Sequence, residues 1–220
     1  MNLLLTFSLF CSIMCLQSCA HKTISVRYEG RLVERYQIDR KTQERDGFYN
    51  LYHSNKKIAL QHHYQQGKLD GVEKIYHETG ALAGVLPLKN GQYDGHFSYY
   101  FIDGTTKQKG YYKNDKINGY LSTYYRNGRL KETVRMVDNK ENGPFRLYSN
   151  TGVLVKTGNY ILLEDKVLEQ GLIYEYDPIS RRLLAKKRCK EGYCCSIWER
   201  GKGYRRPSTS LCDEIMSNDL

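Results

Sequence analysis

Four cysteines near the end of the chain are the residues best able to do chemistry. Cys189, Cys194, Cys195 and Cys212 form this group, and no other cysteine occurs after Cys19. In an exported protein such a cluster most readily forms two disulfides, and four cysteines allow three connectivities. Adjacent cysteines seldom pair with each other. We therefore expect Cys189 to join one member of the central pair and Cys212 to join the other.

Zinc is the competing use of these cysteines. Their spacing, C-x4-C-C-x16-C, lacks the paired C-x2-C knuckles of common zinc sites. The tail also has no C-x-x-C motif, which a thiol-redox enzyme would need. Disulfides are thus the preferred interpretation, and we predict no metal site. An envelope enzyme that uses Cys194 or Cys195 remains an alternative.

The histidines and acidic residues do not combine into a site. His53 and His77 recur at one repeat position, but equivalent positions two strands apart are separated by ~9.6 Å, too far to share a metal. Asp46, Asp70 and Asp94 each precede a glycine, and asparagine replaces them in later repeats, so we interpret them as turn formers. The sequence also lacks the common nucleotide-binding, zinc-protease and serine-hydrolase motifs. We therefore predict no catalytic residue and no cofactor.

A 24-residue repeat organises the middle of the chain. A glycine preceded by Asp or Asn recurs at this spacing, at Gly47, Gly71, Gly95, Gly119 and Gly143. A tyrosine stands five residues after each glycine and again in a sixth, degenerate copy, namely at Tyr52, Tyr76, Tyr100, Tyr124, Tyr148 and Tyr176. A second glycine follows the first by nine residues in four of the five regular copies. Each repeat therefore carries two turn signals.

This pattern predicts an all-β fold, an elongated antiparallel β-meander of tandem hairpins with a small cysteine-rich C-terminal cap. If Asn127-Gly128 is a two-residue loop, Leu121 shares one face of the sheet with Val134. The repeat tyrosines then lie on the opposite face among cations. Tyrosine suits such a thin sheet, because its ring covers neighbouring backbone while its hydroxyl stays in water.

The repeat motif D-G-x-[FY]-x-x-[LIY]-Y-x-x-[ND]-G-x-L resembles the bacterial MORN-repeat variant, found in proteins labelled as YwqK-type antitoxins. The resemblance covers about residues 46–176. It implies a hairpin scaffold that binds proteins or membranes, with no catalytic residue in the motif. The antitoxin label would imply a cytoplasmic partner, which an export signal argues against.

The N-terminus predicts export and lipid anchoring. Residues 3–16 form an apolar run that is too short to span a bilayer as a helix but is typical of a signal-peptide core. The run ends in Leu16-Gln17-Ser18-Cys19, which resembles a bacterial lipobox and implies that Cys19 is the lipid-attachment residue. We expect a protein anchored in the bacterial cell envelope, with the outer membrane favoured in a Gram-negative organism.

These signals divide the chain into a signal peptide (1–18), an N-terminal segment with a half repeat (19–45), the repeats (46–187, five regular and one degenerate) and a basic cysteine-rich tail (188–220). The protein has 220 residues, a net charge of +10 and 20 tyrosines. It is too aromatic for a disordered polyelectrolyte and too polar for a membrane bundle. We expect no nucleic-acid partner, because the tyrosines follow the period of the fold.

The predicted function is that of a membrane-anchored, non-enzymatic repeat lipoprotein that acts as a binding scaffold for a protein or cell-envelope partner. Two alternatives stay open. One is a toxin-neutralising protein of the antitoxin or immunity type, and the other is the envelope enzyme using the cysteine-rich tail.

Overall fold

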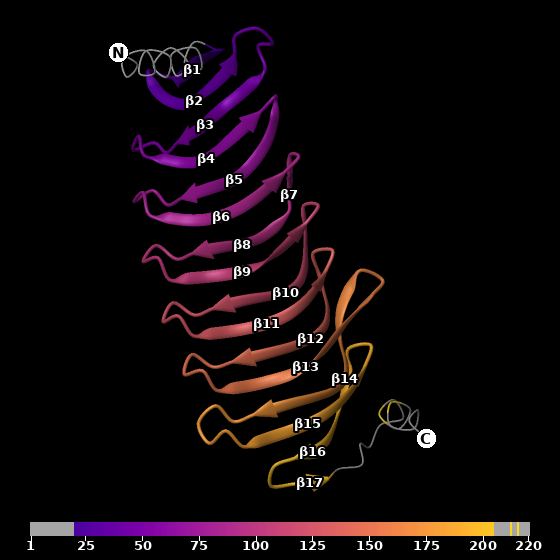
Figure 1. Cartoon of the computed structure of the whole chain (residues 1–220). Helices are drawn as coiled ribbons and strands as arrows, with labels where there is room; N and C mark the ends of the chain where they lie inside the picture. The colour runs from indigo at the N-terminus through magenta and orange to yellow at the C-terminus, as the bar shows by residue number, and fades with distance from the viewer. Residues whose placement is uncertain (1–19, 205–211, 213–214, 216–220) are drawn as a thin grey trace, which may run out of the picture. The chain divides into compact units, whose positions relative to one another are not determined.

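The fold is taken from a computed structural model, which describes residues 20–204, 212 and 215. The chain divides into two compact units. The first contains the described residues up to Gly95 together with Ile102–Gly104, and the second contains His96–Phe101 and the described residues from Thr105 onward. Within each unit, antiparallel strands lie side by side in chain order, which confirms the predicted meander of hairpins (Figure 1).

The strands have the following bounds. The first unit holds β1 (His21–Tyr28), β2 (Arg31–Asp39), β3 (Arg45–Tyr52), β4 (Ile58–Gln65), β5 (Lys68–Tyr76), β6 (Leu82–Lys89) and β7 (Gln92–Tyr93). From the unit boundary onward follow β8 (Gly95–Tyr100), β9 (Thr106–Lys113), β10 (Lys116–Tyr124), β11 (Leu130–Val137), β12 (Lys140–Tyr148), β13 (Leu154–Leu163), β14 (Lys166–Tyr176), β15 (Leu183–Lys190), β16 (Tyr193–Glu199) and β17 (Gly203–Tyr204).

Four of the turns that join one repeat to the next lie four residues before the positions that the sequence predicted, and the turn before the sixth copy lies six residues before Gln170-Gly171. Both residues of each turn have positive φ, which is the geometry of a type I′ hairpin turn. These pairs are Gln66–Gly67, Asn90–Gly91, Asn114–Asp115, Asp138–Asn139 and Glu164–Asp165. The prediction that Asp46, Asp70, Asp94 and the residues after them form turns was therefore wrong.

The repeat glycines instead form bulges inside strands. Gly47, Gly71, Gly119, Gly143 and Gly171 all lie within strands, Gly95 begins β8, and all six have positive φ. In β10, for example, Asn118 pairs with Tyr111 and Ser122 pairs with Lys109, so three residues beginning with Gly119 oppose one residue of β9. A strand needs glycine where such a bulge requires positive φ.

The turns inside each repeat are also longer than predicted. Asn127-Gly128 is part of a three-residue loop, because the amide of Tyr125 donates to the carbonyl of Arg129 and Gly128 has a φ of 80°. This is a type I turn followed by a glycine bulge. The bulge places Tyr124 opposite Leu130, while Leu121 pairs with Val134 as expected.

One pair of positions in each hairpin forms what we call the first core column, which the sequence pattern did not single out. These are the residues two and fifteen positions after the repeat glycine. In the regular repeats the pairs are Tyr49/His62, Glu73/Leu86, Phe97/Gly110, Leu121/Val134 and Phe145/Gly158. Phe97 and Phe145 are 1% exposed, and Leu86 and Val134 are 2% exposed. The column is therefore the main core of both units.

In two of these pairs a phenylalanine faces a glycine. A Cβ atom on Gly110 would lie 2.8 Å from the ring of Phe97, and one on Gly158 would lie 3.1 Å from the ring of Phe145. Neither glycine is required for its φ angle, so the reason is steric. In these two pairs the phenylalanine ring leaves room for only a glycine across the strand pair, and Ile173 closes the space around Gly158 further.

The second core column lies seventeen residues after each repeat glycine, where the sequence predicted buried positions. Leu88 and Met136 are each 7% exposed. Its tyrosine rings pack on the first column, as where Tyr160 stacks on Phe145 with ring centres 4.2 Å apart. Burial and the nearby carboxylates of Glu141, Glu132 and Glu169 raise the pKa of Tyr160 to about 12.

We predict that Gly158→Ala lowers the free energy of unfolding by about 1–3 kcal/mol, because the new methyl group overpacks the space beside Phe145 and Ile173. Urea unfolding measures this change. Phe145→Leu should relieve part of it, so the double variant should be at least ~0.5 kcal/mol more stable than the sum of the single changes. The exposed neighbour Asn159→Ala serves as the control. Strict additivity would contradict the packing argument.

Candidate binding face and disulfide-linked end

The structure brings some of the predicted residues together and leaves others apart. The six repeat tyrosines are all half-buried and occupy equivalent strand-end positions in their hairpins. His62 is mostly covered whereas its neighbour His63 is exposed, as expected for adjacent residues of a strand. Cys19 and the predicted signal peptide lie outside the described residues.

A depression of about 660 Å³ opens on the surface of the second unit, and its lining includes Phe97 and Gly110 of the first core column. The side chains that give it chemical character come from β8, β9 and β10, and they are His96, Lys109, Tyr111, Asn118, Tyr120 and Ser122. Tyr120 is 58% exposed, and His96 meets the edge of Tyr111 with ring centres 5.1 Å apart. The lining thus combines aromatic rings with hydrogen-bonding groups.

This geometry is compatible with the binding of a partner. Its volume lies within the ~300–1,000 Å³ range of ligand sites. Tyrosine can offer both a flat apolar ring and a hydroxyl to a partner. Lys109 also lies over the ring of Tyr124 at 5.4 Å, which places a cation beside the aromatic wall. A partner with apolar surface and hydrogen-bond acceptors would fit here.

The first unit contains a buried polar network in place of an apolar core pair. Glu73 occupies the first core column and is only 6% exposed. Its carboxylate accepts a hydrogen bond from the hydroxyl of Tyr93 at 2.7 Å and contacts Nδ1 of His62 at 3.2 Å. The imidazole stacks on Tyr49 at 4.5 Å, and its Nε2 has no hydrogen-bond partner among the described residues.

The network holds Glu73 in its ionised form. Burial raises the pKa of Glu73, but the hydrogen bonds from His62 and Tyr93 outweigh burial and leave the pKa below its ordinary value. The Nε2 atom of His62 is covered by aromatic rings, so it does not present an accessible base. We interpret the network as a structural replacement for apolar packing.

Both predicted disulfides are present at the end of the second unit. They join Cys189 to Cys194 and Cys195 to Cys212. Cys189 and Cys194 are direct cross-strand partners in the β15–β16 hairpin. Cys189 and Cys195 are buried, whereas Cys194 is exposed. Three of the four cysteines therefore lie on strands that continue the sheet of the second unit.

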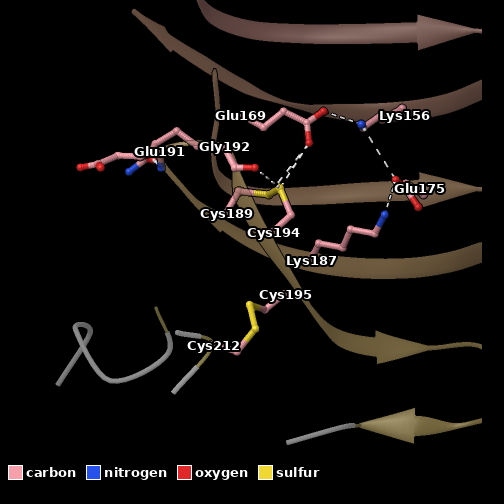
Figure 2. The surroundings of a disulfide bond; sticks show 11 residues. Lys156, Glu169, Glu175, Lys187, Cys189, Glu191, Gly192, Cys194, Cys195 and Cys212 are labelled. Atoms are coloured by element: carbon pink, nitrogen blue, oxygen red, sulfur yellow. Dashed lines mark hydrogen bonds and ion pairs between the residues drawn. A yellow bond between two sulfur atoms is a disulfide. The ribbon is translucent and has the colours of Figure 1, made fainter. Parts of the chain in front are cut away.

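A chain of ion pairs lies beside the Cys189–Cys194 disulfide (Figure 2). The sequence analysis did not predict these ion pairs. Lys156 contacts Glu169 and lies 3.9 Å from Glu175, which in turn accepts a hydrogen bond from Lys187 at 2.8 Å. Lys187 takes the place of a first-column core residue, because the inner turn of the sixth repeat is one residue longer than in the regular repeats. Shifting the repeat register by one residue after this turn would have shown from the sequence that Lys187 occupies a core position.

No helix in the described parts of the chain is both long and apolar enough to cross a membrane.

Comparison with protein families identifies the repeat. Residues 69–90, which run from β5 to the turn after β6, match a family model described as a MORN repeat variant. The chain carries a MORN repeat variant. Its other regular MORN-type hairpins share the same core column and the same positive-φ glycine.

No curated protein matches the chain. Among solved structures, TarM is similar at 15% identity and a TM-score of 0.29, over 46% of this chain and 19% of TarM. A mutant of S. aureus TarM in complex with fondaparinux, alpha-GlcNAc-glycerol and UDP is similar at 14% identity and a TM-score of 0.30, over 45% of this chain and 19% of TarM. A porin-like protein from Bacteroides uniformis is similar at 9% identity and a TM-score of 0.21, over 80% of this chain and 92% of that protein. TM-scores this low carry no argument about function.

We predict that Glu73 stabilises the protein in a pH-dependent way. Its folded-state pKa lies below the ordinary value of 4.5, so the contribution is present above that pH and is lost as the pH falls through the folded-state pKa. Glu73→Gln should therefore be less stable than the wild type at pH 7, and the difference should shrink below pH 4.5. Urea unfolding at a series of pH values measures this difference.

Glu78→Gln is the matched control, because Glu78 is exposed in the same unit. Its stability should follow that of the wild type across the series. A constant difference between Glu73→Gln and the wild type from pH 7 to the acid limit would refute the role given to the ionised carboxylate.

Proposed function

We propose that the protein is a membrane-anchored, non-enzymatic lipoprotein whose MORN-type repeats form a binding scaffold for a partner at the cell envelope. The observation that carries the proposal is the aromatic and polar depression beside Tyr120. It is built on strands rather than loops, so a partner would meet a preorganised surface. The predicted lipid on Cys19 would hold that surface at the membrane.

The start of the fold supports a close tether. Only Ala20 separates Cys19 from His21, the first residue of β1. One residue spans at most ~3.6 Å, so a lipid on Cys19 would hold β1 against the bilayer surface. Residues 20–41 also carry six basic side chains against three acidic ones, namely Lys22, Arg27, Arg31, Arg35, Arg40 and Lys41 against Glu29, Glu34 and Asp39. Such an excess of basic residues favours contact with an anionic membrane surface.

A toxin-neutralising role is the second candidate, and it also uses a binding surface. It differs in requiring one cognate toxin. Rescue of cells from a toxin by the wild type, with loss of rescue on changing Tyr120, would favour it over a general envelope scaffold. The export signal predicted at residues 1–18 favours the scaffold.

We predict that Cys19→Ala abolishes incorporation of a clickable palmitate analogue and moves the protein from the membrane fraction to the soluble fraction. Cys15→Ala is the matched control and should keep both the label and the membrane association. Labelling that survives Cys19→Ala would show that the chain is not acylated at this position.

We predict that a photo-crosslinking amino acid at Tyr120 gives discrete adducts in intact cells. The same amino acid at Ile179, which is 91% exposed but lies in a turn of the same unit, is the control and should give none. His96→Ala should weaken the Tyr120 adducts, since it removes one wall of the depression. Equal crosslinking from both positions would refute a dedicated binding face.

A further inference from the structure

We propose that reduction of the Cys189–Cys194 disulfide creates a binding site for a divalent metal of the zinc class, with Glu169 as the third protein ligand. The site would be closed in the oxidised protein and open in the reduced one. Metal binding would thus report the redox state of the surroundings. This inference is independent of the partner proposed for the depression beside Tyr120.

The three side chains already lie together. One oxygen of Glu169 and the Sγ atoms of Cys189 and Cys194 all lie within 4.8 Å of one another. Figure 2 shows the carboxylate of Glu169 directed at the disulfide. Oε2 lies 3.4 Å from Sγ of Cys194 and 4.0 Å from Sγ of Cys189. The three potential ligands come from β14, β15 and β16.

In the oxidised state the two sulfurs offer this carboxylate oxygen no hydrogen. A disulfide sulfur carries no hydrogen, so the two contacts between Oε2 and sulfur are not hydrogen bonds. Reduced thiols could donate to Oε2, and a metal ion could bind it together with both sulfurs. The arrangement around Glu169 therefore suits the reduced state better than the oxidised one.

The surrounding structure holds Glu169 in this orientation. Lys156 contacts Oε1 and leaves Oε2 directed at the sulfurs. The backbone amide of Gly192 donates to the carbonyl of Glu169 at 3.1 Å, and the amide of Glu191 donates to the side chain of Gln170 at 2.9 Å. The turn of the cysteine hairpin is thus fixed to β14. Bonds to the outer oxygen of a carboxylate are typical of a ligand that is oriented for a metal.

This disulfide is the one that can open without loss of the fold. It links direct partners of a hairpin that backbone hydrogen bonds already hold in register. It closes a span of 5 residues, whereas Cys195–Cys212 closes a span of 17. A longer closed span contributes more stability. Cys194 is also exposed to a reductant, whereas Cys195 is 5% exposed.

The chemistry balances with a dithiol as reductant. One thiolate of the dithiol attacks Sγ of Cys194 and breaks the bond to Cys189, and the second thiolate then displaces Cys194 to form the oxidised dithiol. The protein gains two electrons and two protons, which appear as two thiols. Binding of M²⁺ then displaces both thiol protons.

The resulting ligand set fits a tetrahedral ion. Two thiolates at ~2.3 Å and one carboxylate oxygen at ~2.0 Å are ordinary distances for zinc, and water can take the fourth position. Two thiolates on one such ion are separated by ~3.8 Å, which is easily reached from cross-strand neighbours once the S–S bond is broken. Carboxylate plus two thiolates selects against magnesium and calcium, which prefer oxygen ligands.

Cobalt(II) is the probe, added to the full-length chain with Cys11, Cys15, Cys19, Cys195 and Cys212 replaced by serine. Before reduction we expect no cobalt absorption. After treatment with dithiothreitol and desalting under inert gas, we expect thiolate charge-transfer and tetrahedral visible bands at one ion per chain, with release of two protons per ion. Zinc should displace the cobalt and bleach these bands.

Glu169→Gln should weaken cobalt binding at least ~10-fold. Glu175→Gln is the matched control, because Glu175 belongs to the same ion-pair chain but does not face the sulfurs, and it should keep the parent affinity. Circular dichroism checks the fold of each variant. If loss of Cys195 and Cys212 unfolds the chain, the same titration is made with both retained and with mass spectrometry showing that only Cys189–Cys194 is reduced.

Three results would overturn the proposal. They are cobalt binding that is equal before and after reduction, the absence of thiolate bands in the folded reduced protein, and equal effects of Glu169→Gln and Glu175→Gln.

Discussion

Each repeat hairpin buries one residue against one partner across the strand pair, and this pairing is the constraint on which the rest of the structure depends. A single sheet encloses little volume, so the size of one side chain limits the size of its partner where the pair is closely packed. Phe145 with Gly158 and Leu121 with Val134 are two solutions of the same packing problem. The bulge at each repeat glycine bends the strand beside these positions, which explains why the glycine recurs more strictly than the core residues do.

Polar residues enter this column only where neighbouring groups can satisfy them. Glu73 is tolerated because Tyr93 and His62 bond its carboxylate. Lys187 is tolerated because Glu175 accepts its ammonium group. An uncompensated charge at either position would be costly. These two polar core residues lie in different units and have different partners. Each hairpin therefore stabilises its polar core residue through contacts with neighbouring strands of the same unit.

The period of glycine and tyrosine was enough to predict the hairpin meander, since turn residues and side-chain alternation are local properties. It was not enough to place the turns. An Asp-Gly pair marks positive φ equally well in a turn and in a bulge, and only the register of Asn118 and Ser122 against β9 distinguishes the two. The rule that adjacent cysteines seldom join excluded one of the three connectivities, and the β15–β16 register, which pairs Cys189 with Cys194, decides between the other two. Glu169 could not be found in this way, because its position beside Cys194 depends on how the turn at Gly192 docks on β14.

The last repeat shows how a regular core can become a chemical site. The second core column holds Leu88 and Met136 in regular repeats, and the extra residue in the sixth inner turn brings Cys189 to the equivalent place. A buried thiol there would be an ordinary small apolar residue. Its cross-strand partner Cys194 is exposed, however, and Glu169 on β14 forms an ion pair with Lys156. The sheet thus places a sulfur pair and a carboxylate at one point, and the two sulfurs carry no hydrogen for that carboxylate while the disulfide is closed.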